Sequence, residues 1–180
     1  MKLINIFLFT IIFSSSCNQS NGHKKYERAK HSIIAEKITE KVAQKIEIET
    51  GLHLIGTGGG MMDCVKMMAM SFRGFGEIDV IKGRALIVHC VREYLSAINE
   101  NLDIRPYLSH YPFTSKGIQI RIFITQTTPT AEALCFIGEI DGAVEYDVRK
   151  APQESPEIVH QEPYEEAVRI LESERRLSHL

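Results

Sequence analysis

The chain has 180 residues, of which 44% are hydrophobic and 24% are charged, and its formal net charge is −2. This length suits one domain with tails, and this composition allows a real hydrophobic core and argues against a disordered chain. Lys and Arg are dispersed among Asp and Glu, so no stretch forms a basic face. We therefore expect no nucleic-acid partner.

The first sixteen residues differ in composition from the rest. Met1-Lys2 gives a positive start, residues 3–13 are almost entirely apolar, and residues 14–16 are all Ser. This order of charge, apolar run and small residues is typical of a secretory signal. The apolar run, of about 11 residues, is shorter than the roughly 20 that a membrane-spanning helix needs. We expect residues 1–16 to be a signal peptide.

Cys17, which follows these small residues, resembles the lipobox Cys of bacterial lipoproteins. In that group the signal is removed and the new N-terminal Cys is acylated. The usual lipobox has an aliphatic residue where this chain has Ser14, and the alternative is ordinary cleavage after Ser16. The resemblance implies a palmitate-type anchor on Cys17, with residues 17–25 as a polar tether in the cell envelope. By resemblance to lipoproteins of Gram-negative bacteria, Asn18 rather than Asp after the Cys favours the outer membrane over the inner. The protein would then face the periplasm or the cell exterior.

Periodicity predicts the elements of the first half in chain order. Residues 25–49 carry apolar side chains every four residues, which predicts a helix with Gly51 as its stop. A short strand at 52–55, closed by the glycine-rich residues 56–60, precedes a second strand at 65–72, for which a helix is the alternative. Residues 79–99 form the strongest predicted helix, with Asp79 as its N-cap.

The residue pattern of the second half of the chain predicts mainly strands. Isoleucines alternate with other residues along 118–125, and residues 133–140 and 143–150 flank Asp141-Gly142, a favoured two-residue hairpin turn. That turn would place Ile137 opposite Tyr146, Glu139 opposite Val144 and Cys135 opposite Val148. Three prolines predict a linker at 152–163, before a short helix at 164–174.

These elements predict an α+β two-layer sandwich. Its antiparallel sheet has about five strands, with the helices packed on one face. The globular domain spans residues 26–150, and residues 151–180 form the linker and C-terminal helix.

Two features suggest cofactor chemistry without its full pattern. The glycines at 56–60 could expose N–H groups to a phosphate, but Met61 stands where a dinucleotide fingerprint needs Gly, and no Gly-Lys-Ser/Thr follows. His89 and Glu93 lie one helical turn apart, as two metal ligands could, but a solvated pair is the commoner arrangement. We expect no cofactor and no metal.

Cys64, Cys90 and Cys135 remain after Cys17, and no pair has the spacing of a zinc or thioredoxin motif. Buried thiols without reactivity are the expected arrangement, and the sequence leaves open whether any two form a disulfide. The alternative is a catalytic pair of Cys64 with His53 or His110.

Residues 103–113 form the most individual segment, with three aromatics, two prolines, an Arg and a His in one loop. Loops of this composition often recognise partners, and the alternative is a rigid crossover whose aromatics close the core. The candidate binding residues are Arg105, Tyr107, His110 and Tyr111, with Gly58, Gly59 and Gly60 as a second contact.

This loop, the Gly-Gly-Gly-Met-Met-Asp run at 58–63 and the Ile-x-Ile-x-Ile strand resemble a group of small exported bacterial lipoproteins. The group has no assigned activity, so the resemblance implies no function. The sequence favours a binding or assembly module that is tethered to the membrane and has a protein partner in the envelope. The alternative is a periplasmic hydrolase using Asp63, Arg105 and His110.

Overall fold

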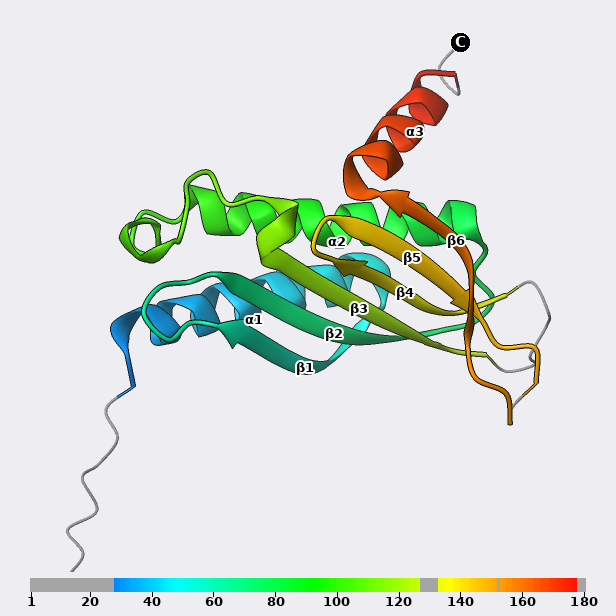
Figure 1. Ribbon diagram of the computed structural model, residues 1–180, viewed down its shortest axis with the longest axis horizontal. Helices are drawn as coiled ribbons and strands as arrows, with labels where there is room; N and C mark the ends of the chain where they lie inside the picture. Colours follow the sequence, from blue (N-terminus) through cyan, green and yellow to red (C-terminus); the bar gives the residue numbers. More distant parts are fainter. Residues whose placement is uncertain (1–27, 127–132, 152, 178–180) are drawn as a thin grey trace, which may run out of the picture.

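A computed structural model describes residues 28–126, 133–151 and 153–177 (Figure 1). The predicted signal peptide 1–16, Cys17 and the tether 17–25 lie outside the described residues. The regular elements are α1 (Lys30–Thr50), β1 (His53–Gly60), β2 (Met67–Phe75), α2 (Val80–Glu100), β3 (Ile118–Thr125), β4 (Leu134–Ile140), β5 (Ala143–Val148), β6 (Glu157–Pro163) and α3 (Tyr164–Leu177), with short 3-10 turns at Arg105–Tyr107 and Ser115–Gly117.

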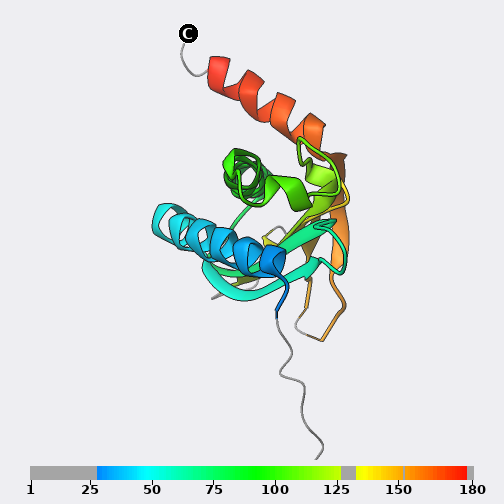
Figure 2. The same cartoon turned by 90° about the vertical axis from the view of Figure 1, so that its left-hand side faces the viewer.

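One six-stranded sheet carries the strands in chain order, β1 to β6. Neighbouring strands are antiparallel except β2 and β3, which are parallel because α2 crosses over between them. α1 and α2 lie on one face of the sheet, and α3 packs against α2, β5 and β6 (Figure 2). The predicted α+β sandwich with helices on one face is confirmed, with six strands where about five were expected.

The start of α2 and the end of α1 have the causes that the sequence predicted. The Asp79 carboxylate accepts the Lys82 N–H at 2.8 Å and caps α2, and Gly51 ends α1 with a φ of 73°. Gly83 in the first turn of α2 has a packing role, since a Cβ there would lie 2.9 Å from a Leu134 methyl. This glycine lets α2 approach β4 closely.

The core lies between the sheet and the two long helices. The isoleucines of β3, which occupy every second position, are buried beneath the two long helices, as the predicted period of two requires. Cys90, Tyr94 and Ile98 of α2 are also fully buried. Burial of this apolar surface is the main force that holds the two layers together.

The predicted hairpin is present, with one difference in register. Asp141 and Gly142 both have positive φ, 54° and 81°, as the expected two-residue turn requires. Ile137 pairs with Tyr146 and Glu139 with Val144, as predicted. The pairing of Cys135 with Val148 was wrong, because a bulge shifts the register and Leu134 takes that place.

Two segments expected to be irregular are strands. The glycines at 56–60 belong to β1 and pair with β2 along their whole length, since glycine accepts extended backbone when a neighbouring strand supplies the hydrogen bonds. Residues 157–163, expected in the linker, form β6 against β5. Only Pro163 of the three prolines lies in β6, and it is the last residue of this edge strand.

A buried ion pair fastens β6 to α2. The Arg84 guanidinium donates to both carboxylate oxygens of Glu162, at 2.8 and 3.2 Å, and the Tyr146 hydroxyl donates to the same carboxylate at 2.7 Å. Despite the desolvation cost, these donors hold the pKa of Glu162 below its ordinary value. Glu162 is therefore ionised and fully partnered at neutral pH.

Glu139 is a second buried carboxyl, on the covered face of β4. One of its oxygens accepts the Gly142 N–H at 2.9 Å, and the other has no hydrogen-bond partner among the described residues. Burial raises its pKa to about 8. The carboxyl is therefore protonated in the folded protein at neutral pH.

Glu162→Ala should lower the free energy of unfolding by about 3 kcal/mol, because it leaves the Arg84 charge buried without a partner. Urea denaturation at pH 7 measures this. The control is Glu157→Ala, on the same strand as Glu162. It breaks only the exposed ion pair with Lys150 and should change stability little. Equal effects of the two variants would contradict the structural role of Glu162.

Glu139→Gln should remove a pH dependence of stability. Between about pH 4.5 and 8 the unfolded chain ionises Glu139 while the folded chain keeps the proton, so unfolding releases a proton there. Wild-type stability then falls as pH rises, by up to about 1.4 kcal/mol per pH unit from this group. Denaturation curves at pH 5, 6, 7 and 8 should show the free energy of unfolding of Glu139→Gln rising relative to that of the wild type as pH rises. Parallel pH profiles would refute this, and Glu145→Gln on the same hairpin is the control.

Candidate functional site

α1 and α2 lie side by side, and one buried hydrogen bond ties them together. The Thr39 hydroxyl donates to the Ala35 carbonyl at 2.8 Å, so it accepts its bond of 2.6 Å from the Tyr94 hydroxyl. Burial raises the pKa of Tyr94, which keeps the proton that this bond needs. The bond restricts sliding of one helix along the other.

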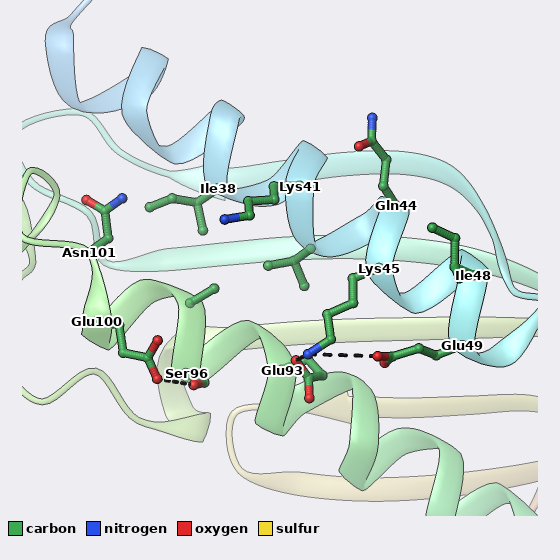
Figure 3. Close-up of a pocket in the computed structure, with 12 residues that line it drawn as sticks. Ile38, Lys41, Gln44, Lys45, Ile48, Glu49, Glu93, Ser96, Glu100 and Asn101 are labelled. Carbon is green, nitrogen blue, oxygen red and sulfur yellow. Dashed lines mark hydrogen bonds and ion pairs between the residues drawn. The ribbon is translucent and has the colours of Figure 1, made fainter.

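The seam between α1 and α2 opens to solvent as a groove of about 640 Å³ (Figure 3). Buried Ile38 and Val42 of α1 and half-buried Ala97 of α2 supply its apolar lining. Ile48, 85% exposed, stands on its wall. Polar and charged side chains complete the lining: Lys41, Gln44, Lys45, Glu49, Glu93, Ser96, Glu100 and Asn101. The groove therefore combines an apolar interior with charges of both signs.

A polar cluster occupies the part of the groove near the end of α1. The Lys45 ammonium reaches across from α1 to Glu93 of α2 at 2.5 Å and lies 3.9 Å from Glu49 (Figure 3). The hydrogen bond from Lys45 to Glu93 raises the pKa of Lys45. Nε2 of His89 lies 3.0 Å from the Glu49 carboxylate. Four titratable side chains from two helices thus meet at this point.

A second pocket, of about 520 Å³, adjoins this cluster. Glu49 lines both hollows, and His89 lines the second together with apolar residues of α2 such as Ala85 and Leu86. The cluster therefore borders two concave surfaces. The i, i+4 spacing of His89 and Glu93 was visible in the sequence, whereas the approach of Glu49 depends on tertiary packing.

The predicted recognition loop, residues 103–113, is fastened to the end of α2. The Asn99 side chain accepts the Phe113 N–H at 2.7 Å and donates to the Phe113 carbonyl at 2.9 Å. Arg105 donates to the Asn99 carbonyl and stacks over the Tyr111 ring at 4.3 Å. The loop thus has the contacts of a rigid crossover, while Tyr111 remains 53% exposed.

The other candidate binding residues lie at the same end of the domain. Tyr107 packs against the His31 ring, and His110 stacks on Phe113. Gly58, Gly59 and Gly60 end strand β1, and the β1–β2 connection that follows contacts the loop through a bridge between Val65 and Leu108. The structure brings the two predicted contact segments to one end of the fold, outside the α1–α2 groove.

The three residues of the hydrolase alternative have separate surroundings. Arg105 contacts Asn99 and Tyr111, and His110 contacts Ser109 and Thr114. Within the described residues, no hydrogen bond or ion pair joins Asp63, Arg105 and His110, and none of them lines either pocket. The hydrolase alternative gains no support from this geometry.

Cys64, Cys90 and Cys135 are all free thiols. Cys90 is fully buried in the core, which raises its pKa to about 12, as expected for an unreactive thiol. Cys64 and Cys135 are only half-buried, so the expectation of burial was wrong for them. Among the described residues, Cys64 makes no hydrogen bond to His53 or His110, so the catalytic-pair alternative also gains no support.

Comparison of the chain with known proteins gave no match to a family model, a curated protein or a solved structure. No helix among the described residues is long and apolar enough to cross a membrane.

Proposed function

We propose that the chain is an exported lipoprotein, anchored through Cys17, whose domain is a binding or assembly module of the cell envelope. The signal-like residues 1–16 and the lipobox-like Cys17 support the anchor. The α1–α2 groove is the observation that supports a binding role. On this proposal the partner is a protein of the envelope, and the groove is the surface that contacts it.

The groove has the properties of a protein-recognition surface. An apolar interior flanked by charged side chains matches the usual arrangement of an apolar centre within a polar rim. Ile48, exposed on the wall of the groove, would contact an apolar side chain of the partner, and the charges of both signs around it would select a partner with complementary charges. The loop 103–113 remains a candidate second contact through Tyr111.

The described chain starts beside the first turn of α1, at the end that carries the loop 103–113 and the β1–β2 connection (Figure 1). A lipid on Cys17 would pull on this end of the domain. The groove runs from there along α1 and α2, and its polar cluster lies near the other end of α1. A partner could therefore reach that part of the groove while the domain is tethered.

Cys17→Ser should abolish lipid attachment. A single acyl chain binds membranes only marginally, whereas the several chains of a lipoprotein Cys hold a protein stably. The wild type should incorporate a fatty-acid analogue and fractionate with membranes, and the variant should not be labelled. Release of both proteins in unlabelled, membrane-free form would contradict the anchor and indicate ordinary cleavage near Ser16.

Ile48→Asp should weaken partner binding by about tenfold or more, because it places a charge on the apolar wall of the groove. Purification of tagged full-length protein from a detergent extract, followed by quantitative mass spectrometry, measures the enrichment of co-purifying proteins. Ile158→Asp, at an exposed position of β6, is the matched control and should leave enrichment unchanged. Loss of enrichment in Tyr111→Ala but not in Ile48→Asp would assign partner binding to the loop. Unchanged enrichment in both variants would contradict a role for either surface.

A further inference from the structure

Three potential metal ligands converge where α1 ends beside the middle of α2. Glu49 comes from the last turn of α1, and His89 and Glu93 lie one turn apart on α2, so both point to the same side of that helix. One ligand atom from each residue lies within 4.8 Å of the other two. An imidazole with two carboxylates is a donor set that suits divalent transition metals.

The imidazole of His89 lacks the hydrogen bond that its surroundings would require. Its Nε2 atom is shielded from solvent and has no hydrogen-bond partner in the described chain. The Glu49 carboxylate oxygen lies 3.0 Å away, but this contact does not have hydrogen-bond geometry. Buried polar atoms normally have a hydrogen-bond partner, so one without a partner needs an explanation, and a bound ion can be that explanation.

The position between the carboxylates already attracts a cation. Lys45 places its ammonium 2.5 Å from Glu93 and 3.9 Å from Glu49 (Figure 3). The Lys45 side chain is 50% exposed, so it can turn into solvent without losing buried packing. Two carboxylates balance the charge of one divalent ion, whereas a single ammonium leaves the pair with one negative charge.

We propose that Glu49, His89 and Glu93 bind a divalent transition-metal ion, with Zn²⁺ as the best fit, and that Lys45 competes with the ion for the two carboxylates. Tetrahedral zinc with bonds of about 2.0–2.1 Å needs ligand atoms roughly 3.4 Å apart. Side-chain rotation can close the present separations, since all three side chains lie at least partly in solvent. Three protein ligands leave one coordination position for water or a ligand from a pocket.

The site goes beyond the proposed binding role, and its three ligands line two neighbouring pockets. Glu93 lines the groove, His89 lines the second pocket, and Glu49 lines both. An ion held by all three would link α1 to α2 and present its open position at the boundary between the pockets. A partner or small molecule with a carboxylate or imidazole group could then complete the coordination.

Isothermal titration calorimetry of the full-length protein in detergent, with Zn²⁺ alone as the titrant, tests the site. The wild type should bind one ion at the cluster. His89→Ala and Glu49→Gln should each weaken that binding by at least about tenfold, the lower bound expected even for loss of a supporting group around a metal. Lys45→Ala should tighten it several-fold, because it removes the competing cation. Thermal melting without zinc checks that each variant is folded.

The matched control is His53→Ala. His53 pairs with Glu47 at 2.8 Å, also at the end of α1, but no third potential ligand joins them among the described residues, so its loss should leave zinc binding unchanged. Zinc binding that is insensitive to His89→Ala and Glu49→Gln would overturn the proposal. So would the absence of binding by both the wild type and Lys45→Ala. A gain in Lys45→Ala that disappears in the Lys45→Ala, His89→Ala double variant would support it.

Discussion

The packing of α1 against α2 is the contact on which the rest of this structure depends. The two helices share a buried apolar seam and one internal hydrogen bond, from Tyr94 to Thr39. Such a bond is worth more inside a protein than at its surface, because breaking it would leave two polar groups buried without partners. It therefore favours one relative position of the helices. That position sets the groove and brings Glu49 beside His89.

The covered face of the sheet also carries the polar groups that are expensive to bury. Glu162 is satisfied by Arg84 and Tyr146, so its charge fastens β6 to α2. Within the described part of the chain, Glu139 has only one hydrogen bond, and it avoids the cost of a buried charge by keeping its proton. Glu162 stays charged and Glu139 stays neutral, although both carboxyls are buried. The difference follows from the number of hydrogen-bond donors within reach of each.

Most elements could be predicted from local pattern, and the exceptions have physical causes. The helices at 30–50 and 80–100 and the isoleucine strand at 118–125 follow their periods, because one face of each packs on the core. β6 was missed because an edge strand that is mostly exposed need not alternate, and its residues 157–162 become a strand only by pairing with β5. The glycines of β1 were missed because glycine has little conformational preference of its own.

The candidate site was less predictable than the fold. The i, i+4 relation of His89 and Glu93 follows from one helix, but Lys45 and Glu49 reach them only through the docking of α1 on α2. Sequence alone also could not decide between recognition and packing for the loop 103–113. The side chain of Asn99, outside that loop, pins it through two hydrogen bonds to Phe113.

Native-state hydrogen exchange tests the docking of α1 and α2 most directly. We expect amides of α1 near Ile38 and Ile46, and of α2 near Ile87 and Ile98, to open with the same free energy as those of β3. All three elements would then unfold as one cooperative unit. Exchange of the α1 amides at a free energy lower by about 2 kcal/mol or more would contradict the account. It would show a helix that leaves the sheet on its own, and the groove would not be a fixed surface.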